Sequence, residues 1–274
     1  MEGIRVLFVS QEITPFLPEN QISIISRYLP QKVQEKGLEI RTFMPRFGCI
    51  NERRNQLHEV IRLSGMNIII NDFDHPLIIK VASIQSARMQ VYFIDNEDYF
   101  HRKAIFYDND GNFFEDNDER SMFFARGVFE TVKKLQWPPD IIHCHGWFTY
   151  MLPVYLKKVY HDDPLFSETK VIISIYNDEF PGILNQALIN KLEEEGINKQ
   201  EITLLANPTY LNLTKTAIEN SDGVIIGSKD VNPEIIKFLE KSKNEYLPYI
   251  SNENYVDSYI DFYDKVLSHA LNKS

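Results

Sequence analysis

The chain has 274 residues, of which 43% are hydrophobic, 12% aromatic and 25% charged, and 39 acidic residues outnumber 29 lysines and arginines. This composition is typical of a globular protein and excludes the disordered, collagen-like and coiled-coil classes. A formal charge of −10 without a long basic run argues against nucleic acid and anionic membranes as partners, because both are bound through their phosphates. No apolar stretch approaches the roughly 20 residues that a bilayer-spanning helix requires.

Two further features bear on location and metal content. The first apolar run begins at Ile4, which leaves no room for a signal peptide before it, so we expect a cytoplasmic protein. Cys49 and Cys144 lie far apart without Cys-x-x-Cys spacing, and they indicate neither a disulfide framework nor a zinc site. We therefore expect no metal and no cofactor.

The opening 44 residues have the pattern of a strand, a helix and a second strand. The β-branched run from Ile4 to Ser10 predicts a parallel strand buried on both faces. Apolar residues at helical spacing follow, Gly37 stands where a helix often ends, and Leu38 to Met44 is the next predicted strand. These elements make a βαβ unit, whose crossover should be right-handed.

The pattern then changes to short β-rich runs between residues 57 and 94, which predict a partly antiparallel insertion. The expected runs are Val60 to Leu63, Met66 to Ile70, Leu77 to Ile84 and Gln90 to Ile94. Beyond them we expect helices over 118–135, 147–160, 184–195, 210–220 and 233–241, and strands over 140–145, 170–175 and 223–227.

The alternation of strands and helices predicts an α/β fold with a Rossmann-like, doubly wound and mostly parallel sheet. We expect one domain over residues 1–274. The last expected element is an amphipathic helix over about 254–271, with tyrosine and phenylalanine at helical spacing, packed on the domain.

Ligands bind an open parallel sheet beyond the carboxyl ends of its strands. The candidate segments are therefore the loops at Gln11 to Gln21, Gly146 to Thr149 and Tyr176 to Gly182. The first loop has no glycine, lysine or arginine, and it carries Glu12 and Glu19, which would repel a diphosphate. Dinucleotide and P-loop fingerprints are absent from the sequence.

The sequence His143-Cys144-His145 ends a predicted strand, which places both imidazoles on one face and the thiol on the other. Two histidines do not complete a zinc site, and hydrogen-bonded structural histidines are the favoured interpretation.

Two acidic segments also stand out. The carboxylates between residues 108 and 119 fail the calcium-loop template, and we expect a solvated loop with favourable charge at the next helix N-terminus. Asp178 and Glu179 follow a strand and are candidate acid or base groups, but a loop that starts at Asn177-Asp178 is the favoured interpretation.

Six segments together resemble the N-terminal lobe of bacterial glycogen synthases and plant starch synthases. They are VLFVSQEITPF at Val6 to Phe16, LEIRTFMPRFGCI at Leu38 to Ile50, VYFIDNEDYFHRK at Val91 to Lys103, DNDERSMFFARGVFE at Asp116 to Glu130, WPPDIIHCHGW at Trp137 to Trp147 and ENSDGVIIGS at Glu219 to Ser228. Members of this family are two-lobed retaining glucosyltransferases of the GT-B type, which transfer glucose from ADP-glucose or UDP-glucose to an α-1,4-glucan. The resemblance implies the fold of one such lobe over residues 4 to 240.

The residues that the family uses on the sugar nucleotide are replaced in this chain. The lysine of the family's K-x-G-G-L motif falls at Pro18, and its two glycines fall at Asn20 and Gln21. The aspartate of the H-x-H-D-W-H motif falls at Gly146, and the histidine that ends the next strand falls at Tyr176. The residual cleft positions that do match the family are Glu12, Tyr99, His145 and Asn177. The resemblance thus implies that this lobe keeps no catalytic residue.

The family's second lobe supplies most nucleotide contacts, and the chain is expected to comprise one lobe with the terminal helix crossing back onto it. The leading hypothesis is a non-catalytic homologue that binds an α-glucan, a metabolite in the residual cleft or a protein partner. The alternative is a glucosyltransferase subunit whose second lobe comes from another chain. A third hypothesis is a different reaction that uses Asp178, Glu179 and His145. No sequence pattern predicts an oligomeric state.

Overall fold

The computed structural model describes residues 3–242, 244–251 and 255–271. The strands are β1 (Arg5–Ser10), β2 (Glu39–Pro45), β3 (His58–Glu59), β4 (Met66–Ile70), β5 (Phe73–Ile84), β6 (Met89–Asp95), β7 (Ile141–His145), β8 (Lys170–Ile175), β9 (Gly223–Ile226) and β10 (Glu245–Leu247). The α-helices are α1 (Gln21–Glu35), α2 (Glu97–Phe100), α3 (Asn117–Leu135), α4 (Met151–Lys158), α5 (Leu188–Glu194), α6 (Tyr210–Glu219), α7 (Pro233–Lys241) and α8 (Tyr255–Leu271).

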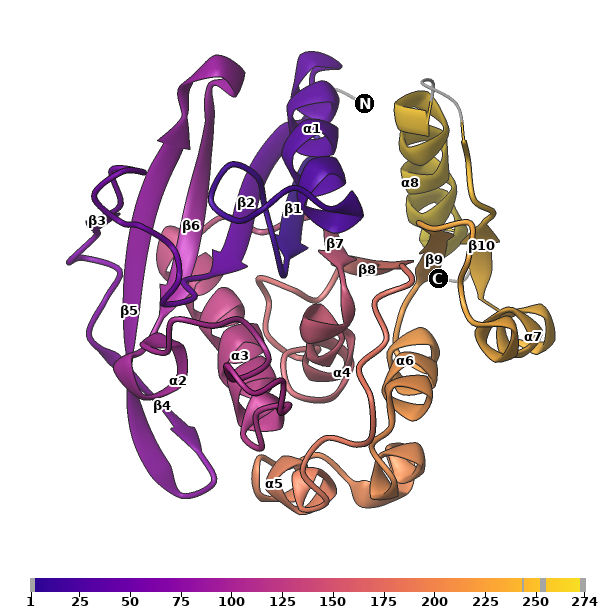
Figure 1. Ribbon diagram of the computed structural model, residues 1–274. Coiled ribbons are helices and arrows are strands. Elements are labelled where there is room, and N and C mark those ends of the chain that lie inside the picture. The colour runs from indigo at the N-terminus through magenta and orange to yellow at the C-terminus, as the bar shows by residue number, and fades with distance from the viewer. Residues whose placement is uncertain (1–2, 243, 252–254, 272–274) are drawn as a thin grey trace.

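The strands of the described residues form one mixed sheet in the order β10-β9-β8-β7-β1-β2-β6-β5-β3, with β4 paired to β5. Helices α1 and α8 pack on one face, and α3, α4 and α6 pack on the other (Figure 1). The sequence prediction of an α/β fold with a doubly wound, mostly parallel sheet is confirmed.

Strand β1 lies in the middle of the sheet because its side chains are apolar on both faces. It pairs in parallel with β2 on one side and β7 on the other, with Val6 opposite both Ile40 and Ile141. Strands β8 and β9 continue the parallel arrangement. Parallel pairing brings the carboxyl ends of β1, β7, β8 and β9 to one edge of the sheet, where ligands are expected.

The β-rich insertion is antiparallel where β5 pairs with β4 and β6, whereas β6 joins β2 in parallel. The prediction of a strand at Val60 to Leu63 is wrong. This run forms a turn, in which the Leu63 N–H donates to the Val60 carbonyl at 2.9 Å. Only Leu63 of the run is buried, and Ile61 is 82% exposed. The apolar residues of this run are therefore not those of a buried strand.

The last described helix, α8, packs against α1 and the sheet edge formed by β9 and β10 (Figure 1). A Cβ atom on Gly223 would lie 2.9 Å from Val266 Cγ2 and 3.0 Å from Phe262 Cε1, so only glycine allows this close approach. The expected helix began at residue 254, which lies outside the described residues. None of the described helices combines the length and apolar character needed to cross a lipid bilayer.

The packing of α8 predicts that Phe262→Ala lowers the free energy of unfolding by about 3–5 kcal/mol, because a large ring only 4% exposed is lost against the sheet. Urea unfolding followed by circular dichroism measures the change. Asp261→Ala, at an exposed neighbouring position of the same helix, is the matched control and should change the stability by no more than about 0.5 kcal/mol. Equal losses in both variants would contradict the docked position of α8.

Candidate functional site

The loops that follow β1, β7 and β8 are hydrogen-bonded to one another at the carboxyl edge of the sheet. The backbone N–H of Gln11 donates to the His145 carbonyl at 3.1 Å, and Phe148 N–H donates to Gln11 Oε1 at 3.2 Å. The Trp147 N–H donates to Asp178 Oδ2 at 2.9 Å. These bonds connect the three candidate loops into one surface.

Pro18 and Asn20, at the family's lysine and first glycine positions, stabilise the N-terminus of helix α1 in this structure. Asn20 caps the helix, accepting from Ser23 N–H at 2.8 Å while its own N–H donates to Ser23 Oγ at 2.9 Å. Asn20 Nδ2 also donates to Glu12 Oε2 at 2.5 Å, and Gln11 Nε2 donates to the other Glu12 oxygen at 3.0 Å. Pro18 offers only its carbonyl, which accepts from the Ser23 hydroxyl at 3.0 Å. Glu12 is therefore held by amides, and a positive charge is missing from this loop.

Gln21, at the family's second glycine position, reaches across the edge to the loop after β9. Its Nε2 donates to the Gly227 carbonyl at 2.8 Å, and the Ser228 hydroxyl donates to its Oε1. The side chain thus joins the start of α1 to the end of β9. A glycine here would leave that space open, so the amide closes a gap between two ligand-facing loops.

Gly146 is held in a backbone conformation that glycine alone favours, with φ of +87°. A Cβ atom at this position would lie 2.3 Å from Gln11 Cδ and 2.4 Å from Gln11 Oε1. The Gln11 side chain, 2% exposed, therefore occupies the place of any side chain at position 146.

His145 and Tyr176 form a buried pair under α1 and α8. Their side chains are hydrogen-bonded, with His145 Nδ1 2.7 Å from the Tyr176 hydroxyl. Burial lowers the pKa of His145 to about 3, so the imidazole is neutral. Tyr176 is 2% exposed and fills the space beside Gly227, where a Cβ atom would lie 2.4 Å from its ring. Both residues belong to the protein interior and offer no surface to a substrate.

The faces predicted for His143, Cys144 and His145 are confirmed. Both histidines face the α8 side, where His143 Nδ1 lies 2.7 Å from the Tyr263 hydroxyl and His143 Nε2 lies 2.8 Å from Ser174 Oγ. Cys144 packs on the opposite face. The described residues hold no group of three or more His, Cys, Asp or Glu side chains that would bind a metal ion.

Asp178 is a half-buried anchor of the edge. Its carboxylate accepts from Trp147 N–H and from the Tyr210 hydroxyl, the latter at 2.8 Å. Burial raises the pKa of Asp178 to about 6 against these two donors. Asn177 and Glu179 on either side are exposed. Asp178 thus ties the loop after β8 to the loop after β7 and to helix α6.

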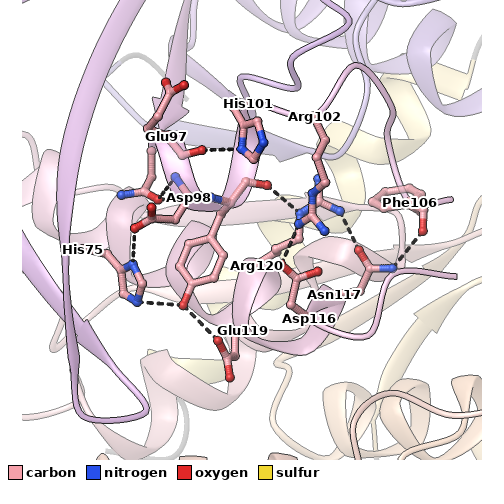
Figure 2. Close-up of polar contacts among 12 residues, drawn as sticks. His75, Glu97, Asp98, His101, Arg102, Phe106, Asp116, Asn117, Glu119 and Arg120 are labelled. Atoms are coloured by element: carbon pink, nitrogen blue, oxygen red, sulfur yellow. Dashed lines mark hydrogen bonds and ion pairs between the residues drawn. The ribbon is translucent and has the colours of Figure 1, made fainter. Parts of the chain in front are cut away.

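Tyr99 lies in a separate polar cluster, although it matches a cleft position of the family. Its hydroxyl lies 2.9 Å from His75 Nε2 and donates to Glu119 Oε2 at 3.1 Å, while Asp98 Oδ2 lies 3.0 Å from His75 Nδ1 (Figure 2). Burial, with the nearby Glu119 charge, raises the pKa of Tyr99. The Tyr99 carbonyl accepts from Arg120 Nε at 2.8 Å, which fixes α2 against α3.

The acidic segment contributes to this cluster in a way that sequence analysis missed. Lys191 of α5 lies 2.7 Å from both Asp118 and Glu119 in the first turn of α3. Asp118 is fully buried, and burial raises its pKa to about 6. The expected favourable charge at the helix N-terminus is present, but the lysine comes from a segment 73 residues away and gave no local signal.

A doubly wound, mostly parallel sheet with loops gathered beyond the carboxyl ends of β1, β7 and β8 defines a Rossmann-like domain. Residues 5–246 match the starch synthase catalytic domain family, and this chain belongs to that family. Glycogen synthase from Chlorobium limicola is 36% identical over 235 residues, which cover 85% of this chain and 47% of that protein. Glycogen synthase from Chlorobium chlorochromatii is 40% identical over 174 residues, which cover 63% of this chain and 36% of that protein.

The chain thus spans about half the length of the curated relatives that it matches. The catalytic domain of starch synthase IV from Arabidopsis thaliana, solved with ADP and acarbose bound, superposes with a TM-score of 0.71 at 18% identity. The superposition covers 91% of this chain and 52% of that one. This likeness shows the fold.

The geometry at Gly146 predicts that Gly146→Ala lowers the free energy of unfolding by about 2–4 kcal/mol, through an unfavourable φ and overlap with Gln11. In a Gln11→Ala background the overlap disappears, so the same change should cost at least about 1 kcal/mol less. Denaturant unfolding of the two single variants and the double variant measures this coupling. Equal costs in both backgrounds would show that Gln11 does not fill the space.

The raised pKa of Asp178 predicts a pH-dependent stability. Between the ordinary value of 3.8 and about 6 the unfolded chain releases this proton while the folded chain keeps it, so the free energy of unfolding falls as the pH rises. Over that range the stability of the wild type relative to Asp178→Asn should fall by up to about 3 kcal/mol. Urea unfolding at several pH values measures the difference. Glu179→Gln, at the exposed neighbour, should run parallel to the wild type, and a parallel curve for Asp178→Asn would contradict the prediction.

Proposed function

We propose that this chain is a non-catalytic homologue of the glucosyltransferase N-terminal lobe and that it binds an α-glucan at the carboxyl edge of its sheet. The absence of catalysis is supported by Gln21, which stands where the family has a glycine. Its side-chain amide is hydrogen-bonded to Gly227 and Ser228. Transfer from a sugar diphosphate depends on positioned positive charge. The loop from Gln11 to Gln21 contains no such charge.

A pocket of about 450 Å³ at the same edge supports glucan as the ligand. It lies between the segments 113–115 and 181–186 and is lined by two phenylalanines, Phe113 and Phe114, and by the amides of Asn185 and Gln186. Phe113 is stacked on Phe180 with ring centroids 5.1 Å apart, which fixes its orientation. Rigid aromatic rings and amide groups together suit a polyhydroxylated ring, because the rings cover apolar C–H faces and the amides both donate and accept hydrogen bonds.

The small number of exposed hydrophobic side chains at the carboxyl edge favours a small ligand over a partner lobe. Nine large hydrophobic side chains of the described residues are at least 36% exposed; one of them, Ile183, lines the pocket, and none lies in the loops 11–21, 146–149 or 176–182. A docking face for a second lobe would instead expose a continuous apolar patch. A cytoplasmic location, as expected from the sequence, is part of the same proposal.

Calorimetric titration with maltoheptaose, ADP-glucose and UDP-glucose tests the proposed function. We expect heat from maltoheptaose alone, and Phe113→Ala should weaken its binding by about tenfold, which is 1.4 kcal/mol. Phe73→Ala, an exposed ring on the β4–β5 hairpin, is the matched control and should leave the affinity unchanged.

Circular dichroism of both variants separates loss of binding from loss of folding. If Phe113→Ala unfolds the chain, Asn185→Ala provides the second test of the same pocket. Binding of a nucleotide sugar would overturn the proposal and would favour a glucosyltransferase subunit completed by another chain. Absence of glucan binding would overturn it as well.

A further inference from the structure

A second pocket, of about 410 Å³, lies at the opposite edge of the sheet, beside the turn that joins β5 to β6. In Figure 1 this turn is at the top, whereas the arrowheads of β1 and β2 point downward to the edge described above. The lining side chains come from the end of α1 and from β2, β5 and β6. They are Gln34, Ile40, Arg41, Ser83, Met89 and Tyr92, together with Arg88 and Gln90.

The charge of this pocket is opposite to that of the chain. Its lining includes two arginines, Arg41 and Arg88, and no acidic residue, although the whole chain carries −10. Neither arginine has an ion pair with a carboxylate among the described residues, which otherwise form many such pairs. The nearest acidic neighbour in sequence, Glu39, is paired with Arg5 at 3.2 Å. Among the described residues no carboxylate neutralises either guanidinium group, so both charges can attract an external anion.

Arg41 is held in position before any ligand arrives. Its Nη1 donates to the Tyr92 hydroxyl at 2.6 Å, and its guanidinium lies 5.6 Å from the Tyr92 ring centroid and 5.1 Å from that of Trp137. Arg41 Nε is buried and has no hydrogen-bond partner among the described residues. A guanidinium fixed in this way loses little conformational entropy when it binds, and its fork geometry suits the oxygens of a phosphate.

The neighbouring groups restrict the ligand further. Arg88 is exposed on the β5–β6 turn with φ of +52°, and Ser83 faces Gln90 across the strand pair. Thr42 of β2 is paired with Val91 of β6 in parallel register. The residues one position earlier, Arg41 and Gln90, therefore also lie side by side. This row of hydroxyl, amide and guanidinium groups offers hydrogen bonds to both an oxyanion and attached hydroxyls.

We infer that this pocket binds a small metabolite bearing a phosphate monoester, with Arg41 and Arg88 holding the phosphate and Ser83 and Gln90 bonding to the attached polar groups. The site lies away from the carboxyl edge, so it is independent of the glucan pocket. A phosphate monoester is favoured over a planar carboxylate because two separate guanidinium groups can share its three oxygens.

Calorimetric titration with glycerol 2-phosphate at constant ionic strength tests this site, with citrate as the carboxylate comparison. We expect glycerol 2-phosphate to bind, and Arg88→Asn to weaken it by about tenfold. Asparagine tolerates the positive φ at position 88, so this variant should keep the wild-type stability. Arg54→Asn removes the same charge from an exposed loop residue outside the pocket and should change the affinity by less than about twofold.

Three results would overturn the inference. One is absence of glycerol 2-phosphate binding to the wild-type chain. Another is equal weakening by Arg88→Asn and Arg54→Asn, which would indicate non-specific attraction. The third is binding of citrate at least as tight as that of glycerol 2-phosphate. This experiment does not use maltoheptaose. Its result is therefore independent of the titration that tests the proposed function.

Discussion

The structure depends on the burial of two imidazoles at the end of the central strand β7. Alternation along a strand sends His143 and His145 to one face, and burial there disfavours their charged forms. Neutral imidazoles need neutral partners, which Tyr263, Ser174 and Tyr176 supply. Tyr263 belongs to α8, and Tyr176 directly follows β8. The hydrogen bond of His143 to Tyr263 therefore anchors α8 to the sheet, and that of His145 to Tyr176 holds the Tyr176 side chain beneath the loops at the carboxyl edge.

The replaced family positions are each held by contacts with neighbouring residues of the edge. Asn20 holds Glu12, Gln21 holds the loop after β9, and Gln11 occupies the space beside Gly146. Each of these side chains fills a space or satisfies a polar group of the edge. A single substitution back to the family residue would break such a contact and leave the others in place. Along this edge, side-chain amides occupy the positions where the family has glycines.

Sequence patterns predicted the parts of this fold that have local causes. The first strand and helix follow from a β-branched run and from helical spacing that stops at Gly37, and the faces of His143 and His145 follow from alternation. Val60 to Leu63 was misassigned because a short apolar run does not distinguish a turn from a strand. The Gln21 amide and the Lys191 pair with Asp118 had no local signal, since their partners lie 206 and 73 residues away. Proximity of that kind is created by the sheet order and cannot be inferred from spacing.

The place of α8 has a consequence for how the chain folds as it is synthesised. Val6, Phe8, Leu29 and Ile141 share one apolar cluster with Tyr259, Phe262 and Val266. Ribosomes release a chain from its first residue onward, so the early members of this cluster emerge more than 100 residues before the aromatic side chains that cover them. Until α8 arrives, this face of the sheet is an exposed apolar surface, which chaperones bind and which promotes aggregation. Completion of the fold on the α1 side therefore has to wait for the synthesis of α8.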